Sequence, residues 1–144
     1  NDEYDSTLYS DLQVVVKRVT ALLPRELDYN ETHYQKVLAR ELKLCDRFKN
    51  FEISTEVNIP YTLHDGFTFG FGRADIILEN RALKECIILE LKASVSTQWK
   101  NMQKFASQVN KYVHHHQTSS RKKGIVIIFN PSFQKKLASV ITIQ

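Results

Sequence analysis

Hydrophobic residues in the first third of the chain recur at the spacing of an α-helix. A first helix is predicted to begin near Asp5 or Ser6 and to end at Pro24, with one apolar stripe formed by Leu8, Leu12, Val15, Val19 and Leu22. A second helix is predicted from about Tyr29 to Leu44. On it, two glutamates share an arc of about 80° with residues expected to be buried, the four being Glu31, Tyr34, Leu38 and Glu41. The glutamates either line a site or lie at the edge of the stripe and reach water through their stems.

After position 50 the pattern changes to the alternation of β-strands. The remaining elements are predicted in this order: strands over 51–63, 67–78 and 85–93, a helix over 97–116, a strand over 124–129, and a short apolar run over 140–143. Asp65-Gly66 is a turn signal between the first two strands. Gly70 and Gly72 indicate either a bulge or a backbone kept clear for a close approach.

The order of these elements predicts the topology of the sheet. A helix between two strands implies a right-handed crossover, so the strand over 124–129 is expected to lie parallel to the strand over 85–93. The first three strands follow as a meander, which gives an α/β fold with a mixed central sheet flanked by helices. We expect one domain, with an N-terminal helix over 1–27, a core over 28–132 and a C-terminal extension over 133–144.

The net charge of +4 is divided unevenly along the chain. Residues 1–90 contain all 16 acidic residues and 11 of the 20 basic ones, a balance of −5. Residues 91–144 contain the other 9 basic residues and no acid, a balance of +9. This asymmetry favours either a face that binds a polyanion, such as nucleic acid, or a solvated basic surface.

The remaining composition is that of an ordinary globular protein, with 42% hydrophobic and 25% charged residues. No apolar run approaches the length of a membrane span, and the acidic start differs from a secretion signal. We therefore expect no membrane partner and an intracellular location, in the cytoplasm or nucleus. Cys45 and Cys86 have no metal-type spacing and are either reduced thiols or a disulfide pair. The triplet His114-His115-His116 is a poor metal site, because neighbouring residues of a helix point to different sides.

Glu90 and Lys92 interrupt the most apolar strand of the chain. Alternation places both on one face of that strand, together with Cys86 and Ile88. An ion pair on the surface of an edge strand would contribute at most about 1 kcal/mol and would leave the apolar neighbours unexplained. Because unpaired charge inside a sheet is costly, two charges at the end of a buried strand indicate a site at the mouth of a cleft.

Asp75 is a lone acid at the start of another apolar stretch. If the strands over 67–78 and 85–93 pair as a hairpin, Asp75 and Glu90 fall at nearly opposite positions. Carboxylates that close repel each other unless a cation lies between them, and Mg²⁺ or Mn²⁺ is the natural occupant of such an oxygen-ligand site. With the ammonium group of Lys92 beside it, this arrangement suits phosphodiester hydrolysis by a metal-activated water.

At this point the chain resembles a known group of enzymes. Asp75 followed by Glu90-Leu91-Lys92 is similar to the D…(D/E)-x-K signature of the PD-(D/E)XK nuclease superfamily, which has a restriction-endonuclease-like αβββαβ core. Further motifs over about 28–132 resemble the GxxExxY-type, RecB-like branch, namely Glu31-Thr32-His33-Tyr34 with Leu38, Glu41 and Leu42, then Glu56 to Pro60, Arg73-Ala74-Asp75, Gln108 with Tyr112, and Phe129-Asn130. Asp28 stands where that branch has its first glycine, so the local turn differs.

The resemblance implies a metal centre built from the matching residues. The implied ligands are Asp75, Glu90, the carbonyl group of Leu91 and a glutamate of the second helix. Glu31 would be that glutamate, with Glu41 as the alternative for the same role. Lys92 would be the catalytic base or would stabilise the transition state.

The resemblance also implies residues that orient the site and bind the substrate. Gln108 would help to orient the active site, with Tyr112 packed beside it one helical turn further on. Arg73 would contact either a phosphate or a nearby acid. Further contacts to the nucleic-acid backbone would come from Tyr112 and from the basic residues Arg121, Lys122, Lys123, Lys135 and Lys136.

These features predict a Mg²⁺- or Mn²⁺-dependent nuclease, a hydrolase that acts on DNA rather than RNA. It would act alone, as a homodimer or as part of a larger protein. The alternative is a catalytically silent module that keeps the fold and binds nucleic acid or protein. Three costly polar groups held in an apolar sheet argue against this alternative.

Overall fold

The computed structural model describes residues 2–23, 27, 29–93, 99–129 and 138–143. In chain order the elements are α1 (Asp2–Leu22), α2 (Glu31–Leu44), the 3₁₀ turn η1 (Asp46–Phe48), β1 (Glu52–Thr62), β2 (Thr68–Asn80), β3 (Glu85–Ala93), α3 (Trp99–His115), β4 (Arg121–Phe129) and β5 (Ala138–Ile143). The helices and the first three strands begin and end within a few residues of their predicted bounds.

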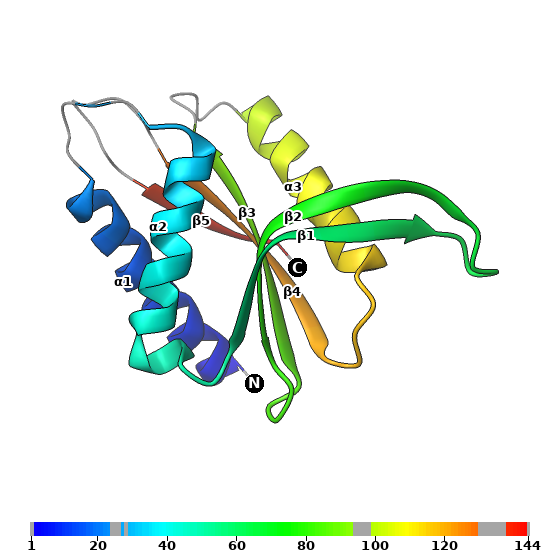
Figure 1. Cartoon of the computed structure of the whole chain (residues 1–144), viewed down its shortest axis with the longest axis horizontal. Coiled ribbons are helices and arrows are strands. Elements are labelled where there is room, and N and C mark those ends of the chain that lie inside the picture. Colours follow the sequence, from blue (N-terminus) through cyan, green and yellow to red (C-terminus); the bar gives the residue numbers. More distant parts are fainter. Residues whose placement is uncertain (1, 24–26, 28, 94–98, 130–137, 144) are drawn as a thin grey trace.

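Within the described residues the strands form one five-stranded sheet in the order β1-β2-β3-β4-β5 (Figure 1). β1, β2 and β3 are antiparallel neighbours, β4 lies parallel to β3, and β5 is antiparallel to β4. β3 is therefore the central strand, and its parallel partner follows α3 as the crossover rule predicts. The predicted α/β fold with a mixed central sheet is confirmed.

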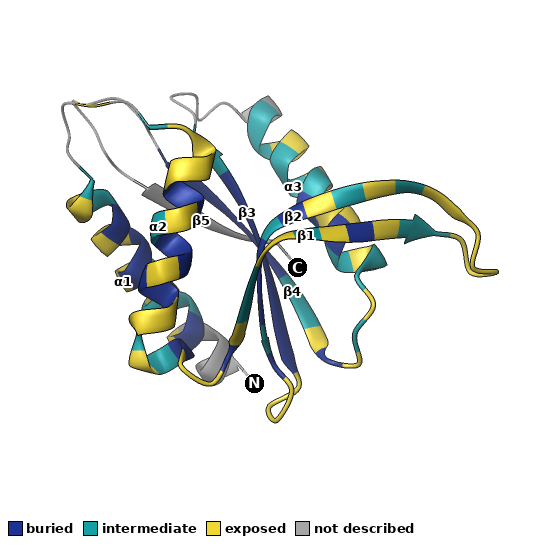
Figure 2. Ribbon diagram, viewed as in Figure 1, coloured by how far each residue is buried: buried dark blue, intermediate teal, exposed yellow. Residues whose placement is uncertain are grey.

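Helices cover both faces of this sheet, with α1 and α2 on one side and α3 on the other (Figure 1). Along β3 the two faces alternate. Leu89 and Leu91 pack into the core formed with α1 and α2, whereas Cys86 and Ile88 pack into the core formed with α3. The central strands are buried almost throughout (Figure 2). Glu90 is thus placed on the α3 face of the most buried strand.

The start of α2 is held by a reciprocal cap. Asn30 Oδ1 accepts a hydrogen bond from the amide of His33 at 3.0 Å, and His33 Nδ1 accepts one from the amide of Asn30 at 3.2 Å. Four residues into the helix, the ring of Tyr34 stacks on Phe129 of β4, with the ring centres 4.3 Å apart. These contacts direct the first turn of α2, which contains Glu31, toward the end of β3.

β4 begins at Arg121, three residues before its predicted start at Gly124. The charged run at 121–123 therefore belongs to the strand and not to the preceding loop. Arg121 pairs opposite Glu85 in the parallel ladder and forms an ion pair with it, while Lys122 Nζ donates to the carbonyl oxygen of His116 at 3.0 Å. These partners let charged residues extend the strand.

The β1–β2 hairpin continues beyond the rest of the sheet as a two-stranded arm, here defined as residues 57–74 (Figure 1). β2 pairs with β1 along most of its length but with β3 only from Ile76 onward. The hairpin changes direction at Glu56, which has a φ of +52°. Before this bend Ile53 packs against the α1 and α2 core, and after it Val57 packs against the α3 core.

The glycines of β2 leave room for tyrosine rings. A Cβ atom on Gly72 would collide with the hydroxyl group of Tyr61 and would lie 2.5 Å from Cε1 of Tyr112. A Cβ atom on Gly70 would lie 3.5 Å from the ring of Tyr61, an ordinary contact. The register also shifts between Tyr61 and Thr62. The close approach and the bulge, which the sequence left as alternatives, are therefore both present.

None of the described helices is long and apolar enough to cross a lipid bilayer. Cys45 and Cys86 are both free thiols, so the two cysteines do not form a disulfide, and Cys86 is fully buried in the core beneath α3.

Candidate active site

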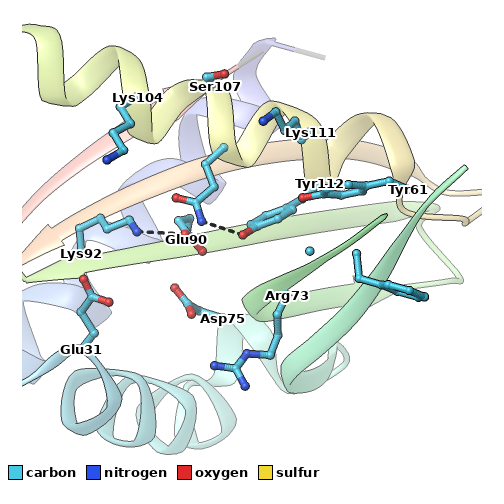
Figure 3. A pocket seen from close by; sticks show the side chains of 13 residues that line it. Glu31, Tyr61, Arg73, Asp75, Glu90, Lys92, Lys104, Ser107, Lys111 and Tyr112 are labelled. Carbon is cyan, nitrogen blue, oxygen red and sulfur yellow. Dashed lines mark hydrogen bonds and ion pairs between the residues drawn. The ribbon is translucent and has the colours of Figure 1, made fainter. Parts of the chain in front are cut away.

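A cavity of about 720 Å³ lies where the arm, the end of β3 and α3 meet. In Figure 3 the side chains of Glu31, Asp75, Glu90 and Lys92 lie close together, and Lys104 and Lys111 lie on the helix opposite them. Seven of the predicted site residues line this cavity, namely Glu31, Arg73, Asp75, Glu90, Lys92, Gln108 and Tyr112. They come from α2, β2, β3 and α3, so the fold gathers residues that are distant along the chain.

Asp75 and Glu90 lie beside each other where β2 separates from β3. The last pair of the β2–β3 ladder is Ile76 with Leu89, and the amide of Leu91 then donates to Asp75 Oδ2 at 2.7 Å. Glu90 is only 3% exposed, and its Oε2 lies 3.4 Å from Lys92 Nζ. Its other oxygen, Oε1, is buried and has no hydrogen-bond partner among the described residues.

The ionised form of Glu90 is unfavourable, because its carboxyl group is buried and lies beside that of Asp75. Burial, and then the negative charge of Asp75, raise the pKa of Glu90 to about 8, although Lys92 acts in the opposite direction. A divalent cation between the carboxylates would offset their repulsion and would give Glu90 Oε1 its missing partner. The donor set therefore fits a hard ion such as Mg²⁺ or Mn²⁺.

Lys92 lies beside Glu90 at the edge of the cavity (Figure 3). Its side chain is 21% exposed, and Nζ lies 5.3 Å from the centre of the Phe105 ring. One carboxylate and one aromatic ring thus hold the ammonium group in place while it keeps access to the cavity. Such a group can stabilise negative charge that develops on a substrate bound there.

The two helix glutamates are placed differently. Glu31 lines the cavity, and its Oε1 accepts a hydrogen bond from the amide of Ala93, at the end of β3, at 3.3 Å. Glu41 is buried further along α2, where its Oε2 pairs with Nε of the adjacent Arg40 at 3.0 Å, and it does not line the cavity. The geometry favours Glu31 for the role that the sequence left open between them.

Gln108 and Tyr112 contact each other on the inner side of α3. Gln108 Nε2 donates to the hydroxyl oxygen of Tyr112 at 2.9 Å, as their spacing on the helix predicts. Burial, followed by the negative charge of Glu90, raises the pKa of Tyr112 to about 12. Burial and Glu90 also raise the pKa of Tyr61, the arm residue that lies over Gly72. Both tyrosines therefore remain neutral hydroxyl groups at the cavity wall.

Several lining residues were missed in the sequence. Lys104, Ser107 and Lys111 of α3 line the cavity, as do Tyr61 and Phe71 of the arm. Lys104 and Lys111 had a signal, because they lie four residues before and three residues after Gln108 and so share its face. Ser107 lies three residues after Lys104 and four before Lys111, at the same helical spacing. The arm residues had none, since their position depends on the bend at Glu56.

The basic residues predicted to bind nucleic acid do not lie together in the structure. Arg73 lines the cavity, and its Nη2 lies 4.0 Å from Glu56 Oε1, so the predicted nearby acid is present, while contact with a phosphate stays a prediction. Arg121 lies next to Glu85, at the end of β3 far from Glu90, and Lys122 lies next to His116. The cavity is not lined by Arg121, Lys122 or Lys123. Lys135 and Lys136 lie outside the described residues.

A second group of metal-type side chains lies at that far end of the sheet. Ligand atoms of Glu79, Cys86 and His116 are within 4.8 Å of one another. The carboxylate of Glu79 already accepts hydrogen bonds from Thr118 at 2.6 Å and Ser120 at 2.8 Å, and burial raises the pKa of Cys86 to about 12. A protonated thiol beside an imidazole does not suit Mg²⁺, which prefers oxygen ligands. The Asp75 and Glu90 pair is therefore the better candidate for a magnesium site.

The family of the chain follows from a match over most of its length. Residues 9–140 match the PD-(D/E)XK nuclease superfamily, and the chain belongs to this superfamily. Its helix-flanked mixed sheet is the restriction-endonuclease-like fold that the sequence predicted. The match confirms the predicted superfamily, while the resemblance to the GxxExxY-type branch stays a prediction.

Among solved structures, the chain is similar to one titled "Crystal structure of SSO0001", with a TM-score of 0.50 and 22% sequence identity. The alignment covers 76% of this chain and 48% of that protein, so the chain spans about half of its length. At this identity the likeness concerns the fold alone. A search of curated proteins found no match.

Proposed function

We propose that this chain is a nuclease that hydrolyses phosphodiester bonds with the help of Mg²⁺ or Mn²⁺. The observation that carries this proposal is the pair of adjacent carboxyl groups of Asp75 and Glu90, with one buried oxygen left without a partner. Lys92 lies beside the pair, and the cavity around them has basic side chains on its walls. Membership of a nuclease superfamily supports the same conclusion.

Asp75 and Glu90 would hold the cation, with the carbonyl group of Leu91 and the carboxylate of Glu31 as further candidate ligands. When bound, a divalent ion would polarise a phosphoryl oxygen and lower the pKa of a water molecule. The amide of Leu91 fixes the direction of the Asp75 carboxylate, and the amide of Ala93 does the same for Glu31. Backbone groups at the end of β3 thus orient both side chains.

Lys92 would act on the substrate. Its ammonium group lies 3.4 Å from Glu90 Oε2 and has access to the cavity, so it would contact a phosphoryl oxygen of a bound substrate. Gln108 and Tyr112, bonded to each other, would form the neutral wall that keeps the reacting group on the β3 side of the cavity. Arg73, Lys104 and Lys111 would bind the neighbouring phosphates.

DNA is the proposed substrate, in keeping with the resemblance to RecB-like nucleases. The test is to incubate the protein with single-stranded, duplex and branched DNA and with RNA, in Mg²⁺, Mn²⁺ or EDTA. D75N and K92A are the test variants, and E52Q and K49A are matched controls, because both control residues are exposed and lie outside the cavity.

We expect cleavage of DNA that requires the metal, with rates lowered at least about 100-fold in D75N and K92A and unchanged in the controls. Cleavage of RNA alone would correct the substrate and leave the site in place. Cleavage that persists in EDTA and in both test variants would overturn the site. Binding without cleavage, equal in wild type and variants, would instead support a silent binding module.

A further inference from the structure

The arm has an exposed apolar surface that the proposed chemistry does not use. We call it the aromatic patch and define it by four side chains, Leu63, Phe67, Phe69 and Phe71, which are 49%, 63%, 55% and 64% exposed. Among the described residues, all the strongly exposed phenylalanines lie here, whereas Phe48, Phe51 and Phe129 are buried. Large apolar side chains gathered at a protein surface are typical of a binding site.

The arm is fixed in place by α3. The amide of Thr62 donates to His115 Nδ1 at 3.3 Å, and the rings of Tyr61 and His115 lie 4.7 Å apart. At the tip, the amide of Leu63 donates to the carbonyl oxygen of Phe67 at 2.8 Å across a turn in which Gly66 has a φ of +93°. The aromatic patch is therefore presented on a braced hairpin, so its binding costs little conformational entropy.

The patch is continuous with the candidate active site. Phe71 lines the same cavity as Asp75, and the two residues belong to one strand, four positions apart. At about 3.3 Å per residue their Cα atoms lie about 13 Å apart, which equals about four base steps of 3.4 Å. Phe71 thus lies within a few nucleotides of a phosphate held at Asp75 and Glu90.

Charges next to the patch match a nucleic acid better than a protein. Arg73 follows Phe71 at the next position on the same face of β2, and Lys104 and Lys111 lie across the cavity on α3. Aromatic rings interleaved with cations are what single-stranded nucleic acids require, because the rings stack on bases while the cations contact phosphates. A duplex offers no free base face to such rings except at its ends.

We propose that the aromatic patch binds unpaired bases of single-stranded DNA next to the cleavage site. The proposal rests on the proposed nuclease function and adds a preference for single strands, flaps or frayed ends over continuous duplex. Phe71 contacts the base nearest the cavity, and Phe67 and Phe69 contact bases further from it.

Binding is measured by fluorescence anisotropy in EDTA, in the D75N background, so that no cleavage occurs. Test variants are F71A and F67A/F69A/F71A, and L44A is the control because Leu44 is equally exposed on α2 but lies outside the arm. We expect F71A to bind a single-stranded DNA about 5- to 150-fold more weakly, since one stacked base is lost, while duplex affinity changes less than about twofold. L44A should match the parent protein.

A conservative variant separates stacking from structure. F71W should restore the affinity that F71A loses, and its tryptophan emission should be quenched by single-stranded DNA more strongly than that of the parent, which has Trp99 alone. Equal loss of single-strand and duplex affinity in F71A, or no loss of either, would overturn the proposal. So would F71W behaving like F71A.

Two further results distinguish the remaining readings. If the arm variants change a dimer into a monomer in light scattering while single-strand affinity is unchanged, the patch is an interface between copies and the proposal is wrong. If single-stranded RNA binds through the patch and DNA does not, the assigned substrate is overturned. Base stacking on the patch without any cleavage would support the proposed role of the patch and refute the nuclease function. Cleavage without stacking would support the nuclease function and refute the proposed role of the patch.

Discussion

The buried carboxyl group of Glu90 should make the stability of the metal-free protein depend on pH. Its pKa is raised from 4.5 to about 8 in the fold, so the folded protein keeps a proton that the unfolded chain releases. Stability from this group is therefore complete below pH 4.5 and decreases as the pH rises toward 8. Each pH unit in this window lowers the free energy of unfolding by about 1.4 kcal/mol.

Glu90→Gln isolates this contribution, because the carboxamide has nearly the same volume and does not titrate. The difference in unfolding free energy between E90Q and wild type should grow with pH and favour the variant. Between pH 4.5 and pH 7 we expect it to increase by about 3 kcal/mol. Titrating groups that do not interact with Glu90 cancel in this comparison because both proteins contain them.

Urea unfolding followed by circular dichroism, in EDTA at pH 5, 6, 7 and 8, measures this difference. E52Q is the control, since Glu52 is exposed and its ion pair with Arg81 is 3.4 Å long at the surface. Adding Mg²⁺ at pH 7 should stabilise wild type and leave E90Q nearly unchanged. A difference that stays constant with pH, or a wild type that is more stable than E90Q at pH 7 in EDTA, would refute the reasoning.

Three more predictions concern the metal affinity, Gly72 and Cys86. Mg²⁺ affinity should rise between pH 6 and pH 8 and level off above pH 8, because metal binding displaces the proton of Glu90. Calorimetry in buffers of different ionisation enthalpy should record proton release at pH 7. An affinity that falls as the pH rises would contradict this prediction. G72A should destabilise the protein by about 2 kcal/mol or more in urea, since its Cβ meets the Tyr61 hydroxyl group, whereas G70A should cost about 1 kcal/mol or less. At pH 8 the Cys86 thiol should resist a thiol reagent in the folded protein and react after unfolding, because it is buried and burial raises its pKa to about 12. The measurement uses C45S, which leaves Cys86 as the remaining cysteine. Rapid labelling of folded C45S would contradict the prediction.

Regular patterns in the sequence were enough to predict most of the fold. Six of the nine residues of β3 are apolar, and its bounds, Glu85 and Ala93, were predicted as the structure has them. The start of β4 was predicted too late because Arg121 and Lys122 look like loop residues. Only the ladder, which sets Arg121 opposite Glu85, shows why charges are stable there.

The candidate site was predictable as far as it depends on local pairing. The placement of Asp75 beside Glu90 follows from the hairpin register alone, and the contact of Gln108 with Tyr112 follows from helical spacing. The choice between Glu31 and Glu41 could not be made, because it depends on how α2 crosses the sheet. The arm was also out of reach, since its direction depends on the left-handed conformation of Glu56, for which a glutamate gives no signal.

The separation of β2 from β3 at Ile76 also makes the hairpin a modular part of the molecule. The backbone amides that bond to Asp75 and Glu31 belong to β3, and neither bond involves a residue of the arm. Inserting one residue on each side of Asp65-Gly66 would lengthen the hairpin by about 3.3 Å without moving the reaction centre. The length of the arm and the chemistry of the candidate site can therefore evolve, or be engineered, independently.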